Sequence, residues 1–413
     1  MASVSIYGHV IVVSDNLPRV LFCTSEIPQS VNAGSMQLFR ALQGYPGDRL
    51  MVLGVPPERD AELLPCRYEP LKLITYRIAC TRFRQWTSGL NALNTFVEPQ
   101  LGRSLRLARE FAPDLVVTVM DKLSYYKHAW ALARRLHVPL LTITMDDPQT
   151  FERAHPWLER VFVRFLRRLY RDASLSLGVS QEMCVYLSKR FGKGSQVFYF
   201  GPPEGISPRP PRESLSLKSP PQLTLGYAGS LGLGYWDGIN SLLDSLTATK
   251  TKLNIYTRDQ HCLPRHPQLI NRGFHPLDEL WPKVQAECDV VLLPYAFEGP
   301  MLRVYRTHFP TKLSEYCWIG MPMLLVGPKF ATGVRWGQQH PDAALTATSP
   351  VPEVLAPILG RLQTDNALRV SMADAGASTA RAEFDPVAIK LKFVEFLRQA
   401  TRGMASVGGR ERR

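Results

Sequence analysis

Two series of alternating strands and helices, separated by one proline-rich segment, place the strongest constraint on the fold of this chain. Apolar strand-like segments and helical stretches alternate from residue 19 to residue 200, and the same alternation begins again at residue 223. This pattern is typical of mostly parallel sheets that helices cover on both faces. Residues 201–222, between the two series, are rich in proline and serine, as expected of a boundary between domains.

The pattern predicts an α/β protein with two domains and a final helix. Domains of about 200 residues fit a chain of this length. Within the first domain, residues 71–78 resemble a strand, Ser180 is expected to cap a helix, and residues 1–17 have no assignment. The predicted parts are residues 1–205 (first domain), 206–222 (linker), 223–384 (second domain), 385–400 (final helix) and 401–413 (a disordered tail rich in Gly, Arg and Ser).

The formal net charge of +13 predicts attraction to polyanions such as nucleotide phosphates, lipid diphosphates or an anionic membrane surface. Residues 157–171 form an amphipathic helix with an arginine-rich face. Two interpretations stay open: contact with anionic lipid, or arginines that are solvated or paired with acids such as Glu152 and Glu159. No recognition motif for nucleic acid accompanies the charge, so we expect no nucleic-acid partner. The arginines are Arg160, Arg164, Arg167, Arg168 and Arg171.

The cysteines are scattered, odd in number and never spaced as C-x-x-C, which favours reduced thiols over a disulfide framework or a zinc site. No apolar run approaches the roughly 20 residues that span a bilayer, and the N-terminus lacks a signal-peptide pattern. We therefore expect a cytoplasmic protein, associated peripherally with the inner face of the cell membrane if the arginine-rich face contacts lipid.

Residues 309–322 form the most informative segment of the second domain. They follow an apolar strand and predict a helix that a glycine ends before the next strand. On this helix Thr311, Lys312 and Glu315 share one face. The free N–H groups at the helix start and Lys312 suit a phosphate, and Glu315 suits a diol such as a ribose. The alternative is an ordinary amphipathic helix with an exposed Lys312–Glu315 pair.

One motif in this segment resembles the donor-binding signature of glycosyltransferases: Phe-Pro-Thr-Lys-Leu-Ser-Glu-Tyr, followed by Gly-Met-Pro before a strand. The resemblance is to enzymes of the GT-B fold, which has two Rossmann-like domains, and to their group 1/family 4 type. It implies that the final helix crosses back to the first domain, that Glu315 holds the ribose and that Lys312 faces the diphosphate. A nucleotide-diphosphate sugar is then the expected partner, and no cofactor is expected.

The second domain opens with a glycine-rich turn that begins at Gly229. Such a turn is weak evidence alone, because tight strand-to-helix turns need glycine anyway. In the resembled family this loop meets the diphosphate, and an arginine and a lysine commonly follow. This chain has Ser230 after the glycine, so Lys312, with Arg303 or Arg306, is expected to supply the positive charge.

Two further donor contacts follow from the resemblance, each with a structural alternative. The family has two glutamates separated by seven residues, but Thr307 stands at the earlier position. Glu298 is the nearest acid upstream, and it is either a contact of the donor sugar or a loop acid without a ligand. Phe274 and His275 either border the nucleobase, or are a core residue and the neighbour of a helix cap.

The sequence lacks the Asp-x-Asp motif with which a metal-dependent transferase would hold a cation, and this predicts a metal-independent site.

On the acceptor side, Gly34 follows the first predicted strand of the first domain and Asp146 follows a later one. Sites in open α/β sheets form at such strand ends. Four other residues near these ends are equal candidates for a base or an acceptor clamp, and the sequence does not select among them. They are Asp121, His128, Asp147 and His155.

Together these features predict a metal-independent, hexosyl-type glycosyltransferase acting on a glycan or a polyprenyl-linked acceptor. Lys312 would stabilise the leaving diphosphate, and Glu298 is the second candidate catalytic residue. The family resemblance favours retention of the anomeric configuration. Two alternatives remain open: a nucleotide-sugar epimerase of the same fold, and a nucleotide-sugar-binding protein without turnover.

Overall fold

The computed structural model describes residues 5–7, 10–12, 17–74, 100–151, 155–203, 222–259 and 263–405, together with residues 77, 83, 85, 86 and 92. The chain forms two compact units. The first unit comprises residues 1–199 and 387–413, and the second comprises residues 200–386. Two short strands of the N-terminal region, β1 (Ser5–Tyr7) and β2 (Val10–Val12), pair antiparallel with each other.

Within its described residues, the first unit is built on a seven-stranded parallel sheet. The central strands are buried along their whole length and consist largely of valine, leucine and isoleucine, as in parallel sheets with both faces covered. The strand order is β5 (Arg67–Pro70), β4 (Leu50–Gly54), β3 (Val20–Thr24), β6 (Leu115–Val119), β7 (Leu140–Thr144), β8 (Leu175–Gly178) and β9 (Gln196–Val197).

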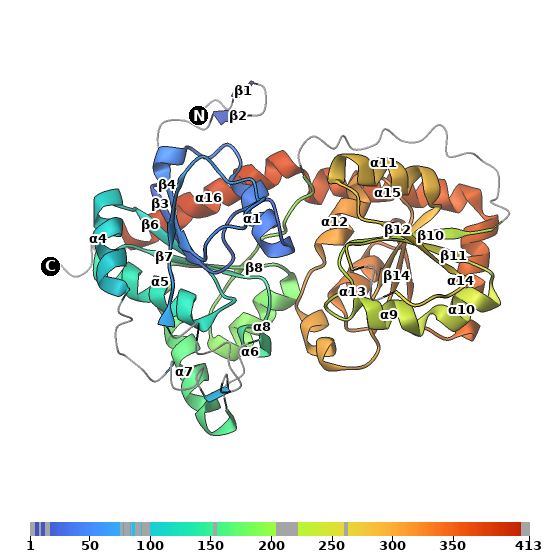
Figure 1. Cartoon of the computed structure of the whole chain (residues 1–413), viewed down its shortest axis with the longest axis horizontal. Helices are drawn as coiled ribbons and strands as arrows, with labels where there is room; N and C mark the ends of the chain where they lie inside the picture. Colours follow the sequence, from blue (N-terminus) through green and yellow to red (C-terminus); the bar gives the residue numbers. More distant parts are fainter. Residues whose placement is uncertain are drawn as a thin grey trace. The chain divides into compact units, whose positions relative to one another are not determined.

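The helices of the first unit pack on this sheet (Figure 1). Ser180 caps α8 as predicted, because its Oγ accepts a hydrogen bond of 2.9 Å from the backbone N–H of Met183. The helices are α1 (Ala33–Leu42), α4 (Leu101–Phe111), α5 (Leu123–Leu136), α6 (Pro148–Phe151), α7 (Pro156–Asp172), α8 (Gln181–Phe191) and α16 (Pro386–Ala405).

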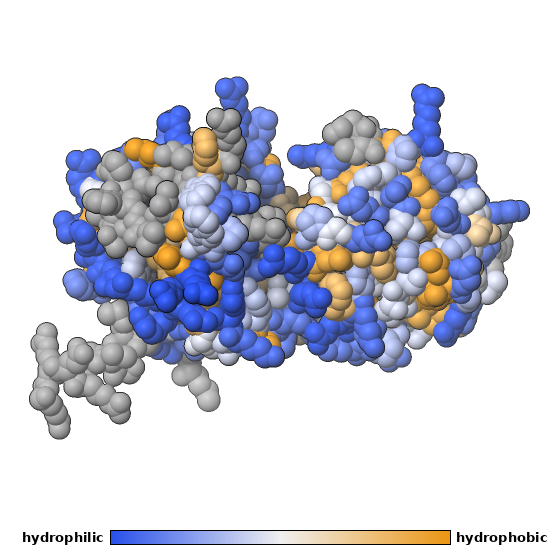
Figure 2. All heavy atoms as spheres, turned by 90° about the horizontal axis from the view of Figure 1, so that it is seen from below, coloured by the Kyte–Doolittle hydropathy of each residue, from blue (hydrophilic) through white to orange (hydrophobic). Residues whose placement is uncertain are grey.

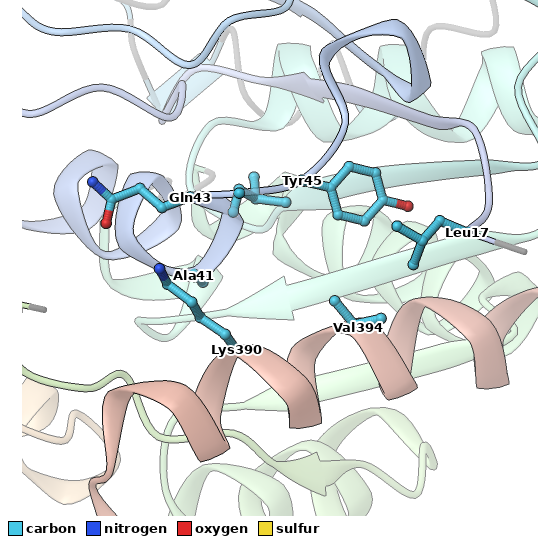
Figure 3. Close-up of a pocket in the computed structure, with 8 residues that line it drawn as sticks. Leu17, Ala41, Gln43, Tyr45, Lys390 and Val394 are labelled. Carbon is cyan, nitrogen blue, oxygen red and sulfur yellow. The ribbon is translucent and has the colours of Figure 1, made fainter. Parts of the chain in front are cut away.

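Helix α16 follows the second unit in the sequence but packs within the first, as expected of a crossover helix. Its Lys390 and Val394 line, with Ala41 and Tyr45 among others, a cavity of about 10 Å³ (Figure 3). This volume holds about one water molecule, so the cavity is a packing space too small for a ligand. Phe393 of the same helix stacks on Phe198, with ring centroids 5.0 Å apart.

The described part of the second unit has a six-stranded parallel sheet with its own helices (Figure 1). The strand order is β12 (Leu269–Gly273), β11 (Lys252–Tyr256), β10 (Thr224–Ala228), β13 (Val290–Pro294), β14 (Met323–Val326) and β15 (Ala344–Ala347). The helices are α9 (Tyr235–Ser241), α10 (Leu243–Ala248), α11 (Leu277–Glu287), the 3-10 helix η3 (Pro300–Arg306), α12 (Thr311–Trp318), α13 (Thr332–Gln339), α14 (Pro352–Thr364) and α15 (Asn366–Glu383).

Each sheet has one point where its strand order reverses. In the first unit the chain moves outward from β3 to β4 and β5, then returns to place β6 on the other side of β3. In the second unit β10 stands between β11 and β13 in the same way. Ligands of open parallel sheets bind outside the carboxyl ends of the strands at such points.

The predicted α/β fold with two parallel sheets is confirmed, and some element bounds differ from the prediction. The strand predicted at residues 71–78 is wrong in place, since β5 lies at Arg67–Pro70. All residues of this edge strand are exposed or half-buried, and the apolar Leu71 and Leu73 that suggested a strand are buried beyond its end. Helix α16 continues to Ala405, past the predicted end at residue 400. The predicted linker, apart from residue 222, and residues 406–413 of the tail lie outside the described residues.

Candidate functional site

The turn after β10 begins at Gly229, and Lys312 lies directly against it. Gly229 has φ 131°, a conformation that L side chains rarely adopt. A Cβ at this position would overlap Cε of Lys312 and lie 3.1 Å from its Nζ. The backbone N–H of Gly229 donates a hydrogen bond of 2.9 Å to the carbonyl of Tyr256, which fixes the turn to β11. The strand-to-helix turn therefore leaves the space that the lysine fills.

Aromatic rings flank the ammonium group of Lys312. Its Nζ lies 4.2 Å from the ring centroid of Tyr235 and 5.5 Å from that of Tyr227. Cation–π attraction stabilises a cation in such a position. Burial lowers the pKa of Lys312 to about 8, and the carboxylate of Glu315 partly opposes this shift. A partly desolvated ammonium of this kind is well suited to receive an anion.

Helix α12 adds an uncapped N-terminus beside the lysine. It begins at Thr311 after Pro310, and no side chain of the N-cap residue hydrogen-bonds to its first N–H groups. Its Tyr316 accepts a hydrogen bond of 3.1 Å from the backbone N–H of Ala228, which ties α12 to the end of β10. Thr311, Lys312 and Glu315 are all half-buried. The positive end of the helix and the lysine thus lie together at the reversal point of the second sheet.

Asp259 shapes the glycine-rich turn, and sequence reasoning missed it. Its Oδ2 accepts hydrogen bonds of 3.0 Å from Ser230 Oγ and 2.8 Å from the backbone N–H of Leu231. Ser230 Oγ also accepts a hydrogen bond of 3.1 Å from the backbone N–H of Gly232. Asp259 follows β11, and its position in the sequence was the one signal that could have pointed to it. Only the strand order reveals that β11 lies beside β10 and brings Asp259 to the turn. Where the resembled family has an arginine, this chain has a serine bound to an acid.

The far end of the turn is held by η3. Tyr305 donates a hydrogen bond of 2.7 Å to the carbonyl of Leu233, and a side chain at Gly234 would overlap its hydroxyl group. Arg303 and Arg306 on the same 3-10 helix are exposed, and Arg306 stacks on Phe330 at 4.0 Å from the ring centroid. Of the two arginines predicted as phosphate partners, Arg306 is thus engaged elsewhere.

The other predicted donor contacts differ in their surroundings. Glu298 is exposed in the loop after β13, whereas Thr307, at the position of the family's earlier glutamate, is buried. Phe274 is 48% exposed, so the alternative that placed it in the core is wrong. The guanidinium of Arg258 stacks on it at 3.9 Å from the ring centroid.

His275 has partners at the start of α11. Its Nε2 lies 3.0 Å from the carbonyl oxygen of Arg272, and its Nδ1 lies 3.7 Å from Glu279, in the first turn of the helix. These contacts fit the alternative in which His275 is the neighbour of a helix cap.

On the acceptor side, the structure separates structural residues from candidates. His128 is buried on α5, its Nε2 lies 3.0 Å from Ser104 Oγ, and burial lowers its pKa to about 4. Asp147 accepts hydrogen bonds from the backbone of Gln149 and the hydroxyl of Tyr186. His155 stacks on Trp86. These contacts fit the structural interpretation of the three residues.

Three candidates remain at the strand ends of the first sheet. Gly34 lies at the start of α1, Asp146 follows β7, and Asp121 follows β6 at the reversal point.

Across the described ranges, no group of three or more His, Cys, Asp or Glu side chains is arranged to hold a metal ion. Among the described helices, none combines the length and the apolar character that crossing a membrane requires.

Comparison with known proteins identifies the fold. No protein-family profile matches the chain, and no curated protein matches it in sequence. Solved structures do match. The Anabaena protein HepE in complex with UDP and glucose has a TM-score of 0.65 at 18% identity, covering 92% of this chain and 99% of HepE. Sucrose-phosphate synthase from Thermosynechococcus elongatus has a TM-score of 0.63 at 14% identity, covering 93% and 99%.

A glycosyltransferase from Rickettsia africae also has a TM-score of 0.63, at 11% identity, covering 93% of this chain and 98% of its own. Likeness at this level of identity concerns the arrangement of the backbone. The chain therefore has the GT-B fold, the two-sheet architecture of these glycosyltransferase structures.

Proposed function

We propose that this chain is a glycosyltransferase that uses a nucleotide-diphosphate sugar as its donor. The observation that carries the proposal is the position of Lys312, against Gly229 and at the uncapped start of α12. A glycine turn, a helix N-terminus and a lysine at one strand end form a site for a diphosphate. HepE, which shares the fold, has been solved with UDP and with UDP-glucose, and this supports the same class of donor here.

The chemistry needs positive charge where the leaving group forms. When the bond between the anomeric carbon and the β-phosphate oxygen breaks, its electron pair stays on the diphosphate. Lys312 and the N–H groups at the start of α12 stabilise that charge, and Arg303 is the candidate for a second cation. A charge-assisted hydrogen bond contributes about 1.5–3 kcal/mol. Because these protein groups supply the charge, the proposal includes turnover without a metal ion.

The nucleoside end of the donor is assigned to neighbouring residues. Glu315 is one turn along α12 from Lys312, so its carboxylate can accept hydrogen bonds from the ribose hydroxyls. Phe274, with Arg258 on its face, offers an exposed aromatic surface near the end of β12 for the base. Glu298 remains a candidate contact of the sugar.

One observation favours the alternative of binding without turnover. Ser230 and Asp259 occupy the turn where the resembled family commonly has a cation, so less charge faces the leaving group. The experiment that separates the alternatives is incubation with a panel of UDP- and GDP-sugars, scored for nucleotide release and for epimerised donor. Slow nucleotide release that persists in EDTA and increases with an acceptor supports the transferase. Binding without release or epimerisation supports the binding protein.

The proposal also includes the class of acceptor and the place where the enzyme meets it. We assign the acceptor to a glycan or polyprenyl-linked chain at the cytoplasmic face of a membrane, with retention of configuration. The support is the arginine-rich face of α7, where Arg160 and Arg164 are exposed. Figure 2 shows the first unit from the side on which α7 projects in Figure 1, and hydrophilic side chains predominate there. Near an anionic surface each arginine adds about 1 kcal/mol.

The apolar side chains of α7 face the core of the first unit. Phe162, Phe165, Leu166 and Leu169 are buried in the core of the first unit, so they are not available to a headgroup boundary. Trp157, 82% exposed in the first turn, is the large apolar side chain that α7 presents. Glu159 pairs with Arg190 of α8, and Glu152 lies outside the described residues. Attraction to a membrane would therefore be mainly electrostatic.

A further inference from the structure

The first sheet has its own reversal point, between β3 and β6, and this point carries carboxyl groups. Ser25 and Glu26 directly follow β3, and Asp121 follows β6. In the second unit the corresponding position, between β10 and β13, carries the glycine-rich turn that lies against Lys312. A ligand-binding position is therefore expected in each unit, with opposite charge in the two.

The side chains at this position are held in place from two strand ends and a helix. Ser25 Oγ donates a hydrogen bond to Asp121 Oδ2. Ser35 in the first turn of α1 donates a hydrogen bond of 3.0 Å to Glu26 Oε2. A Cβ at Gly34 would lie 3.2 Å from the same carboxylate oxygen, which is closer than most side chains tolerate. The absence of a side chain at Gly34 keeps space beside Glu26.

One carboxyl oxygen here lacks a protein partner. Asp121 Oδ1 is buried, and it accepts no hydrogen bond from the described residues. Such an atom is costly unless a ligand or a proton satisfies it. Burial and then the carboxylate of Glu26 raise the pKa of Asp121 to about 7, while the hydrogen bonds from Ser25 and from the backbone N–H of Lys122, and the charge of Lys122, oppose the shift. Asp121 therefore changes its protonation state in the neutral pH range.

The chemistry of this group selects its ligand. Carboxyl oxygens accept hydrogen bonds from hydroxyl groups, and two neighbouring carboxyls repel a phosphate. We propose that Ser25, Glu26 and Asp121 form a binding site for the hydroxyl groups of an uncharged, unphosphorylated sugar. This inference deepens the proposed function, because it makes the acceptor group at the first unit a neutral polyol.

The test uses the full chain and ligand-observed NMR, with methyl glucoside as the neutral probe and glucose 6-phosphate as the anionic one. Wild-type protein should bind the glucoside in preference to the phosphate. Asp121→Asn should weaken glucoside binding at least tenfold, and Ser25→Ala should weaken it less. Asp60→Asn, at an exposed loop acid, is the matched control and should bind as wild type does. Melting curves check that each variant is folded.

A pH series separates a binding role from a structural one. Glucoside affinity should rise with pH through about 7 as Asp121 ionises. In Glu26→Gln the midpoint should move to lower pH, because the carboxylate that raises the pKa of Asp121 is gone. Titration with UDP and GDP, run in parallel, tests the donor site separately. Absence of nucleotide binding contradicts the proposed function, whereas glucoside binding that is absent in wild type, or unchanged in Asp121→Asn, overturns this inference.

Discussion

Lys312 occupies the space that the missing side chain of Gly229 leaves open at the end of β10. A Cβ on Gly229 would overlap Cε of the lysine, and the glycine also has a positive φ of 131°. The two residues are far apart in the sequence, but each restricts the other. The fold thereby holds the end of the Lys312 side chain against the turn, with its ammonium group near the ring of Tyr235.

Replacement of Gly229 by alanine should displace Lys312 and weaken binding of nucleotide diphosphates at least tenfold. The new methyl group would be strained by its backbone conformation and would overlap the lysine. Gly360→Ala is the matched control, since a Cβ there meets nothing within 4 Å in the middle of α14. This control should leave binding unchanged and stabilise the protein by about 0.5–1 kcal/mol. Calorimetric titration with UDP and GDP measures the effect, and equal affinities of the two variants would argue against the contact.

The pKa of Lys312 makes the stability of the unliganded protein depend on pH in a specific window. Lysine in the unfolded chain titrates near 10.5, whereas in the folded protein the value is about 8. Between these values the unfolded chain binds more protons, so this residue makes the free energy of unfolding rise with pH. In Lys312→Met the contribution is absent. The variant should therefore be more stable than wild type at pH 7, and the difference should shrink towards pH 10.5.

Denaturant unfolding of both proteins at several pH values measures this difference. The buried cysteines and tyrosines also titrate at high pH, but their contributions are common to both proteins and cancel. A difference that stays constant from pH 7 to pH 10.5 would show that the lysine is not desolvated.

Asp259 should act on donor affinity through its charge and on the turn through its hydrogen bonds. Asp259→Asn keeps an oxygen that can accept hydrogen bonds from Ser230 and Leu231, but it removes a negative charge beside the diphosphate site. We expect Asn to strengthen binding of nucleotide diphosphates several-fold and Ala to weaken it, because Ala releases the turn. Titration with nucleoside and nucleoside diphosphate separates the charge effect, which should appear only with the diphosphate. An equal change in diphosphate affinity in Asp259→Asn and Asp259→Ala would contradict this account of the turn.

The arginine-rich face of α7 should attract anionic vesicles. Arg160 and Arg164 are the best positions to reverse, since Arg167 donates a hydrogen bond to the carbonyl of Arg190 and Arg168 lies over Trp130. At about 1 kcal/mol for each arginine, changing both to Glu should weaken vesicle binding at least tenfold. Wild-type binding should also fall as salt increases.

Reversal of Arg361 and Arg381, two exposed arginines of the second unit, is the matched control and should have little effect. Co-sedimentation with vesicles of anionic and of neutral lipid measures the binding. If both double variants bind as well as wild type, α7 does not face the membrane.

The sequence allowed good prediction of elements whose signals are local. The cap at Ser180 depends on residues within one turn, and the buried central strands are mostly apolar. The edge strand β5 was placed wrongly because it is polar and half-exposed, so hydrophobicity does not mark it. Its neighbours Leu71 and Leu73 are buried without belonging to the strand.

The acceptor-side residues show why a site is harder to predict than a strand. Asp121, Asp146 and Asp147 follow their strands in similar ways in the sequence. Only the order of strands in the sheet places Asp121 at the reversal point beside Ser25. Asp147 instead accepts a local hydrogen bond from the backbone N–H of Gln149 at the start of α6. Asp259 was missed for the same reason, because its contact with the glycine-rich turn depends on β11 lying next to β10.

The most direct test of the central claim compares a nucleoside with its diphosphate in two variants of α12. Lys312→Ala should weaken binding of the diphosphate by about 1.5–3 kcal/mol and leave binding of the nucleoside unchanged. Glu315→Ala should weaken both ligands without unfolding the chain. Calorimetric titration of the folded variants with uridine, UDP, guanosine and GDP gives all of these values. Wild-type affinity for the diphosphates in both variants would contradict the assignment of α12 as the donor site.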